Sequence, residues 1–179
     1  MAQFPWPNGA KCAVALTFDE DGECIPLLYD PPNARKRLAL QSEGMYGPNV
    51  GTPRILDLLD RHGINGTFFS PGFVVERHPE LMREIIARGN ELGHHGYLHE
   101  RPDFVDEDEE ERIMIRGLEV LEEVTGVRPR GYRSPAWERE PLRWLGINAG
   151  LQAMTIADAE ESVTRLPSTV ARAVSPLLG

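Results

Sequence analysis

The sequence predicts an α/β fold built on a parallel sheet, and three observations lead to this prediction. Short apolar runs alternate with segments of helical periodicity, which is the pattern of strand–helix units. Four such units follow one another with no repeat or linker between them. The residues with catalytic potential come directly after predicted strands, where parallel α/β folds place their active sites. Both part of a (β/α) barrel and an open parallel sheet fit this order.

Four short apolar segments are the predicted strands. They are CAVALTF at 12–18, GTFFS at 66–70, ELGHH at 91–95 and GYR at 131–133. Apolar runs of this length between turn and helix signals are typical of buried strands. The carboxyl end of each strand then leads into a loop that carries polar side chains.

Helices are predicted over residues 52–63, 79–89 and 106–126. Each begins at a capping residue or a proline and stops at a glycine, and apolar residues recur within it at helical spacing. Residues 22–50 contain many prolines and glycines and predict a long irregular loop. Loops of this length in compact domains are usually lids or binding loops.

Composition limits the class of protein. The 179 residues, 41% hydrophobic and 26% charged, predict a single globular domain over residues 1–179. A formal net charge of −9 argues against nucleic acid and against an anionic membrane surface as partners. No apolar run is long enough to span a membrane, and the first residues do not resemble a signal peptide. With two cysteines, these features predict a cytoplasmic protein with free thiols.

The first chemical motif is LTFDEDGE at 16–23, directly after the first predicted strand. Side chains alternate in extended chain, so Asp19 and Asp21 are expected on one side and Glu20 on the other. Two carboxylates on one side repel each other unless a cation lies between them or one holds a proton. An acidic turn after a strand, without catalytic role, is the plainer alternative.

The second motif is GHHGYLHE at 93–100. The i, i+4 spacing of His95 and His99 would let both imidazoles meet one ion from a helical turn, whereas His94 is expected to point away. With an aspartate of the first motif they form a ligand set that suits zinc, cobalt or manganese. Three protein ligands leave positions open for water and substrate, as in catalytic sites.

The third motif is GYRSPAWE at 131–138. A buried arginine at a strand end, Arg133, would pair with a carboxylate and hold it ionised, which suits Asp19 as a base. Pro135 and Trp137 would then wall the pocket. The alternative is a surface arginine before a turn, with Trp137 in the core.

Together the three motifs resemble the polysaccharide deacetylases of carbohydrate esterase family four, also called the NodB-homology domain, over residues 10–138. The family's TFDD appears here as TFDED, similar to a subgroup with peptidoglycan-deacetylase-like proteins and cyclic-imide hydrolases. Its H-[ST]-x-x-H motif appears with Gly96 in place of the hydroxyl residue, and its R-x-P motif appears as Arg133-Ser134-Pro135. Each motif alone is weak, but the combination is specific.

The resemblance implies a deformed (β/α) barrel and the hydrolysis of an amide by metal-activated water. The metal ligands would be Asp21, His95 and His99. Asp19 would act as the catalytic base, and Arg133 would orient it. The metal is expected to be zinc, with cobalt or manganese as alternatives.

The resemblance also implies substrate contacts from the third motif. The backbone N–H of Ala136 would help to stabilise the oxyanion, and Pro135 and Trp137 would line the pocket. Residues 139–179 do not match the family; they suggest helical pieces around RWLGINAGLQAM and ADAEESVTRL. No histidine follows His99, so the barrel is expected to be incomplete and to lack the family's late general acid.

Three functions follow from these expectations. The first is a metal-dependent deacetylase of N-acetylated sugars or their polymers. The second is a cytosolic amidohydrolase that opens cyclic imides or ureides, which the missing export signal and the long 22–50 loop favour. The third is a catalytically impaired metal-binding fragment. Because an incomplete barrel exposes strand edges, a homo-oligomer is one way to cover them.

Overall fold

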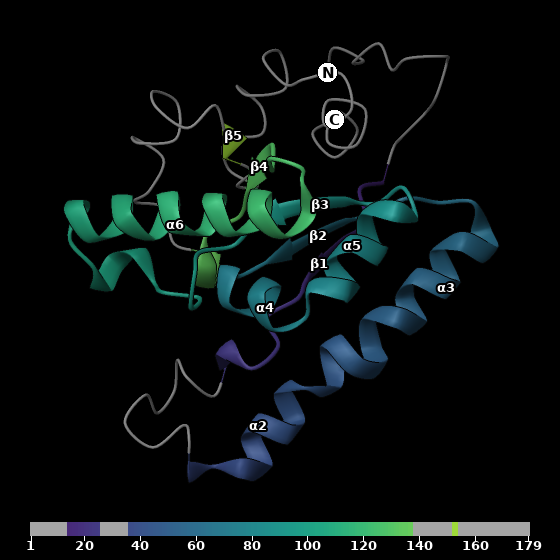
Figure 1. Cartoon of the computed structure of the whole chain (residues 1–179), viewed down its shortest axis with the longest axis horizontal. Helices are drawn as coiled ribbons and strands as arrows, with labels where there is room; N and C mark the ends of the chain where they lie inside the picture. The colour runs from purple at the N-terminus through teal and green to yellow at the C-terminus, as the bar shows by residue number, and fades with distance from the viewer. Residues whose placement is uncertain (1–13, 26–35, 138–151, 154–179) are drawn as a thin grey trace, which may run out of the picture.

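Five parallel strands form the centre of the protein. The computed structural model describes residues 14–25, 36–137 and 152–153. The strands lie in the order of the chain, each beside its predecessor (Figure 1). They are β1 (Thr17–Asp19), β2 (Thr67–Ser70), β3 (Glu91–His94), β4 (Gly131–Tyr132) and β5 (Gln152–Ala153). The parallel α/β class predicted from the sequence is therefore confirmed.

The register brings the carboxyl ends of the strands to one edge of the sheet. Asp19 pairs with Phe69 across β1 and β2, and Ser70 pairs with His94 across β2 and β3. His94 in turn pairs with Tyr132 of β4. The loops after β1, β3 and β4, which carry the three sequence motifs, consequently start close together.

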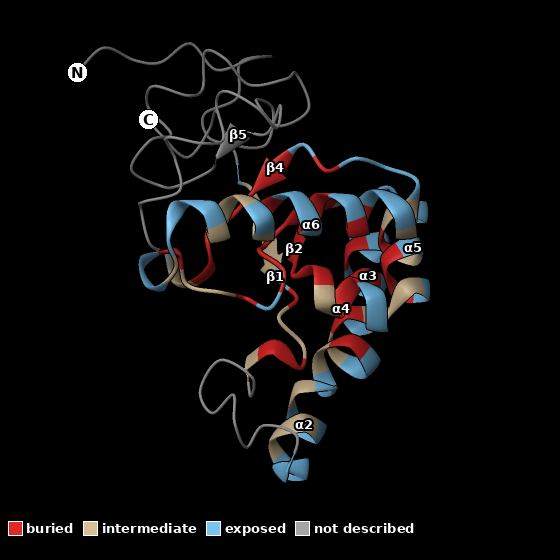
Figure 2. Cartoon of the chain, turned by 60° about the vertical axis from the view of Figure 1, so that its left-hand side comes forward, coloured by how far each residue is buried: buried red, intermediate tan, exposed pale blue. Residues whose placement is uncertain are grey.

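Helices from the β1–β2, β2–β3 and β3–β4 connections pack on one side of this sheet (Figures 1 and 2). Parallel strands that follow one another in order are joined by right-handed crossovers, and this places their helices on a common side. The helices are α3 (Thr52–His62), α4 (Gly72–Arg77), α5 (Pro79–Ala87) and α6 (Glu107–Thr125). The fully buried side chains between sheet and helices include Phe68, Val74, Met82, Ile85 and Leu121.

The predicted glycine ends of α3 and α6 and the predicted cap of α6 are confirmed. Thr52, the capping residue predicted for the first of these helices, is instead the first residue of α3, and its hydroxyl donates to Glu20. Helix α3 ends at Gly63, whose φ of 62° is left-handed. Helix α6 begins after Asp106, whose side chain accepts a hydrogen bond from the Glu109 N–H at 2.8 Å. It ends at Gly126, with a φ of 73°.

The predicted irregular loop at 22–50 is wrong in part. It contains α2 (Leu38–Gly44) and a π-helical turn, η3 (Gly47–Gly51), which runs directly into α3. Helix α2 buries none of its residues, so it offers no apolar stripe from which it could be predicted. The short helix α4 was also not predicted.

Two further predictions need correction or lie outside the description. Residues 14–16 of the predicted first strand do not form strand, and β1 begins at Thr17; residues 12 and 13 lie outside the described part. Gln152–Ala153, predicted to be helical, pairs with β4 as strand β5. The remaining residues of the segment 139–179 lie outside the described part. Among the described residues, no helix is long and apolar enough to cross a bilayer.

Candidate active site

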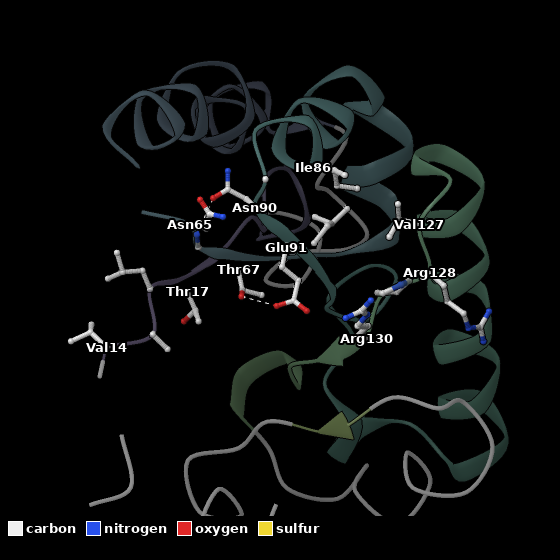
Figure 3. Close-up of a pocket in the computed structure, with 16 residues that line it drawn as sticks. Val14, Thr17, Asn65, Thr67, Ile86, Asn90, Glu91, Val127, Arg128 and Arg130 are labelled. Atoms are coloured by element: carbon white, nitrogen blue, oxygen red, sulfur yellow. Dashed lines mark hydrogen bonds between the residues drawn. The ribbon is translucent and has the colours of Figure 1, made fainter. Parts of the chain in front are cut away.

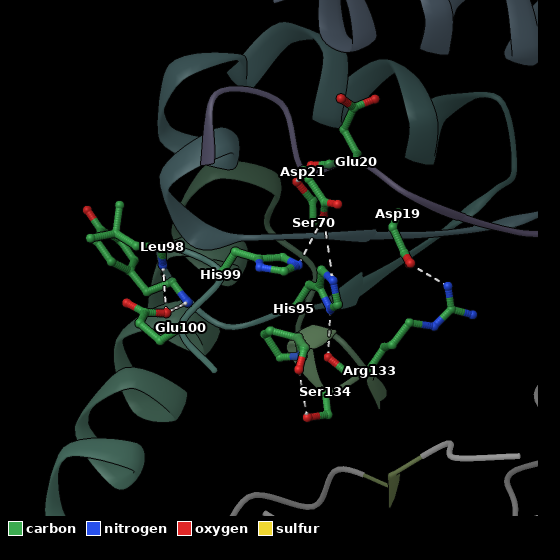
Figure 4. Close-up of polar contacts among 12 residues, drawn as sticks. Asp19, Glu20, Asp21, Ser70, His95, Leu98, His99, Glu100, Arg133 and Ser134 are labelled. Atoms are coloured by element: carbon green, nitrogen blue, oxygen red, sulfur yellow. Dashed lines mark hydrogen bonds and ion pairs between the residues drawn. The ribbon is translucent and has the colours of Figure 1, made fainter. Parts of the chain in front are cut away.

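Three side chains with metal-ligating atoms meet at the carboxyl edge of the sheet (Figure 4). Asp21 follows β1, His95 directly follows β3, and His99 lies in the loop beyond it. The potential ligand atoms of these three residues all lie within 4.8 Å of one another. The structure thus brings together the residues that the sequence predicts as metal ligands.

His95 is oriented by a backbone carbonyl. Its Nδ1 lies 2.7 Å from the carbonyl oxygen of Arg133, and a carbonyl only accepts, so Nδ1 carries the proton. Nε2 is therefore left with its lone pair, 3.5 Å from Asp21 Oδ1. Burial lowers the pKa of His95 below its usual range, which keeps the ring neutral at neutral pH. A neutral, oriented imidazole is the form that binds metals.

Asp21 is a partly buried carboxylate, and one of its oxygens has too little compensation from the protein. Its Oδ1 is buried and has no hydrogen-bond donor among the described residues. Burial raises the pKa of Asp21, and the nearby His99, with Nε2 3.8 Å from Oδ1, opposes this rise. A buried carboxylate oxygen facing two imidazoles is costly alone and is what a divalent cation neutralises. The donor set therefore fits such a cation.

The prediction that the two histidines converge through a helical turn is wrong. The chain from Gly96 to His99 is a loop with two left-handed residues, Gly96 with φ of 76° and His99 with φ of 61°. The carbonyl groups of Gly96 and Tyr97 accept hydrogen bonds from the first N–H groups of α4, at 3.0 and 2.9 Å. The loop, and not helical spacing, sets the direction of His99.

Arg133 connects the third motif to the first (Figure 4). Its Nη1 donates to Asp19 Oδ1, and its Nη2 donates to Thr17 Oγ1 at 2.6 Å. Its guanidinium carbon also lies 4.2 Å from the centre of the Phe69 ring. The Arg133 side chain is 8% exposed, whereas that of Asp19 is 25% exposed. A fixed arginine thus orients a carboxylate that remains accessible from the site.

Glu20 points away from this site, as the alternation of side chains predicts. Its carboxylate accepts a hydrogen bond from Thr52 Oγ1 at the start of α3, and its carbonyl accepts one from Ser70 Oγ at 3.3 Å. Burial, then the charges of Asp21 and Glu23, raises the pKa of Glu20 to about 7. Glu20 therefore joins the first motif to α3 and does not face the histidines.

The predicted substrate-binding residues have varied surroundings. Pro135 is fully buried, and its Cγ would lie 3.2 Å from a Cβ placed on Gly96, so it packs beneath the second-motif loop. Ala136 has a left-handed φ of 59° and is partly buried. The side chain of Trp137 lies outside the described part of the chain.

Sequence reasoning missed several residues that support the site. Thr17 holds Arg133, and Glu100 accepts two backbone N–H groups of the histidine loop. His94, fully buried, packs so closely on α6 that a Cβ on Gly117 would lie 2.0 Å from its Nε2. These contacts join segments far apart in sequence or depend on loop geometry, so no local pattern indicates them.

A separate cavity of about 390 Å³ lies at the opposite, amino ends of the strands (Figure 3). Its lining includes Val14, Thr67, Asn90, Glu91 and Arg130. None of the three candidate metal ligands borders it. A cavity of this kind could suggest a binding site, but the convergent ligands and the arginine–carboxylate pair indicate that the chemistry takes place at the other edge of the sheet.

One curated relative shows how far the similarity extends along the sequence. A peptidoglycan deacetylase of Helicobacter pylori is 38% identical over 97 residues, which covers 54% of this chain and 33% of that protein. The chain thus spans about a third of the length of this curated relative.

Solved structures agree with the architecture. A candidate polysaccharide deacetylase from Mycobacterium smegmatis has a TM-score of 0.73 and 51% identity, covering 78% of this chain and 49% of that one. The Bc1960 peptidoglycan N-acetylglucosamine deacetylase has a TM-score of 0.60 and 28% identity, covering 79% and 55%. Such neighbours have (β/α) barrel folds, so the predicted fold of this type is confirmed for the part shared. The family model for polysaccharide deacetylases matches residues 7–144, and the chain belongs to this family.

Proposed function

We propose that this chain carries the metal site of a hydrolase that removes the acetyl group from an N-acetylated sugar or its polymer. The observation that carries the proposal is the convergence of Asp21, His95 and His99 beside the Asp19–Arg133 pair. The H. pylori relative is a peptidoglycan deacetylase, and Bc1960 is a peptidoglycan N-acetylglucosamine deacetylase. Both names support an amide of an acetylated amino sugar as the substrate.

The proposed cofactor is a divalent metal, zinc first and cobalt or manganese as alternatives. Asp21, His95 and His99 would hold it through one carboxylate oxygen and two imidazole nitrogens. A divalent ion there would lower the pKa of a water ligand and polarise the amide carbonyl. The Bc1960 structure contains an N-hydroxybenzamide, and hydroxamates are general metal chelators, which supports the same cofactor class.

The protein's own residues would accept and hold the proton that the attacking water loses. Asp19 would accept it, because its carboxylate does not belong to the ligand cluster and Arg133 fixes its orientation. Arg133 serves the site twice, since its carbonyl oxygen also sets the tautomer of His95. The backbone N–H of Ala136 is the proposed oxyanion donor.

The other two functions receive less support. The two named relatives whose activity is stated are deacetylases, which favours acetyl removal over the opening of cyclic imides or ureides. The catalytically impaired fragment stays a prediction, because residues 138–151 and 154–179 lie outside the described part. The cytoplasmic location and the homo-oligomer remain predictions.

The decisive experiment is a zinc titration of the metal-free chain by competition with a chromogenic chelator. We expect one tight equivalent, which a His95→Ala/His99→Ala variant loses and a His62→Ala control keeps, because His62 lies exposed at the end of α3. Absence of stoichiometric binding by the wild-type chain would refute the proposal.

Activity is then measured as metal-dependent acetate release from N-acetylglucosamine oligomers, with a cyclic imide as the competing substrate. Acetate release that is lost in the His95→Ala/His99→Ala variant supports the deacetylase. Turnover of the imide alone would replace this assignment with the amidohydrolase.

A further inference from the structure

The turn between the two histidines is fastened to the protein on its carbonyl side. The carbonyl oxygens of Gly96 and Tyr97 accept hydrogen bonds from the N–H groups of Gly72 and Phe73. These two donors belong to the first turn of α4, whose N–H groups have no partners within the helix. The turn therefore cannot move without breaking contacts at the start of α4.

A single carboxylate fastens the amide side of the same turn (Figure 4). Oε2 of Glu100 accepts the N–H of Tyr97 at 3.0 Å and the N–H of Leu98 at 2.8 Å. Hydrogen bonds from backbone N–H groups to a carboxylate are charge-assisted and stronger than neutral ones. No other acceptor for these two N–H groups is found among the described residues.

Glu100 and Gly96 fit each other in space. A Cβ added to Gly96 would lie 3.2 Å from Glu100 Oε2 and 3.2 Å from Pro135 Cγ. Glu100 thus occupies the space into which a side chain at position 96 would project. The glycine that departs from the H-[ST]-x-x-H pattern and the glutamate after the second histidine form one structural unit.

His99 needs this support because of its backbone conformation. Its φ of 61° lies in the left-handed region, which residues with side chains rarely adopt. Such a conformation persists only where the surrounding contacts impose it. Glu100 directly follows His99, and its side chain accepts hydrogen bonds from Tyr97 and Leu98, which precede His99. Glu100 therefore fixes the chain on both sides of the histidine.

We propose that Glu100 is a positioning residue for the metal site: its carboxylate holds the 96–99 turn so that His99 faces Asp21 and His95. Glu100 does not belong to the ligand cluster and acts only through the loop. The inference rests on the proposed function for its metal, but the contact itself can be measured without one.

The contact is tested first by hydrogen exchange of the metal-free, full 179-residue chain. We expect Glu100→Ala to speed exchange of the Tyr97 and Leu98 amides by about ten-fold or more, because they lose their acceptor. Glu100→Gln, whose amide oxygen still accepts, should keep most of the protection. Glu119→Ala, which removes an exposed carboxylate on α6, is the matched control and should change neither amide.

Zinc affinity provides the second measurement. Loss of a residue that orients a ligand typically weakens metal binding by about 10- to 100-fold. We expect a loss in this range for Glu100→Ala, near wild-type affinity for Glu100→Gln, and none for the Glu119→Ala control. Glu100→Asp keeps the charge but shortens the side chain, so its zinc affinity should resemble that of the alanine variant. If the alanine variant does not fold, the comparison of Glu100→Asp with Glu100→Gln replaces it.

The outcomes separate the two proposals. Wild-type exchange rates and wild-type zinc affinity in Glu100→Ala would overturn the positioning role. Equal losses in Glu100→Gln and Glu100→Ala would also overturn it, because charge and not the loop contact would then matter. If the wild-type chain binds no zinc, the proposed function fails, and the exchange data alone judge the role of Glu100 in the turn.

Discussion

Replacing Glu20 by glutamine should change how the stability of the protein depends on pH. Glu20 is 4% exposed and accepts a hydrogen bond from Thr52 Oγ1, a contact that the glutamine oxygen can also accept. Burial, with the charges of Asp21 and Glu23, raises the pKa of Glu20 from 4.5 to about 7. The variant therefore removes one titrating group and keeps the shape of the site.

The sign and size of the effect follow from proton linkage. Between pH 4.5 and 7 the folded state holds a proton on Glu20 that the unfolded state has lost. Its contribution to the free energy of unfolding is thus fully present below pH 4.5 and is lost as the pH rises through about 7. At about 1.4 kcal/mol per pH unit, this interval corresponds to roughly 3 kcal/mol.

Urea unfolding of the metal-free chains at pH 4.5 and pH 8 measures this difference. As the pH rises from 4.5 to 8, we expect the free energy of unfolding of Glu20→Gln to increase by about 3 kcal/mol relative to that of the wild type. Groups such as His94 and His95 titrate in both chains, so their contributions largely cancel in the comparison. Glu119→Gln, at an exposed position of α6, is the control and should show no such gain. Parallel pH profiles for wild type and Glu20→Gln would refute the reasoning.

Two further variants test other parts of the site. Gly117→Ala should cost about 1–3 kcal/mol in urea unfolding, because its Cβ would lie 2.0 Å from Nε2 of the fully buried His94. Adding the smaller His94→Asn should recover part of that cost, and strictly additive losses would contradict the clash. Arg133→Lys should lower kcat by on the order of 10²-fold, since one ammonium cannot replace both the Asp19 and the Thr17 contacts. Zinc affinity of this variant should change little, because His95 bonds the backbone carbonyl at 133 and not the side chain. An equal loss of kcat and of zinc affinity would contradict these separate roles of side chain and backbone.

Local signals account for what the sequence predicts well. Helix ends depend on single residues, such as Gly63 in the left-handed region and Asp106 as an N-cap, and both act in the structure as predicted. Alternation along an extended chain is equally local, and it places Asp19 and Asp21 on the side opposite to Glu20.

Tertiary contacts explain what the sequence could not predict. The i, i+4 spacing of His95 and His99 suggested a helix, yet the turn is held by the start of α4 and by Glu100. Spacing states only how many residues separate two ligands, and several backbone paths of that length bring imidazoles together. Helix α2 likewise has no buried face, so no periodicity could show it.

Three consecutive carboxylates at the end of β1 have three different environments, and the position of Glu20 between the two aspartates explains why. Asp19 pairs with Arg133, whereas Asp21 faces the two histidines. With one residue between them, extended geometry directs both to the same side and forces Glu20 to the opposite, buried side. That burial needs a donor and room: Thr52 supplies the hydroxyl, and Gly47, where a Cβ would lie 2.8 Å from Glu20 Oε1, leaves the space. The TFDED motif and the segment 47–52 therefore depend on each other, and a side chain at position 47 should disturb the aspartates although it touches neither.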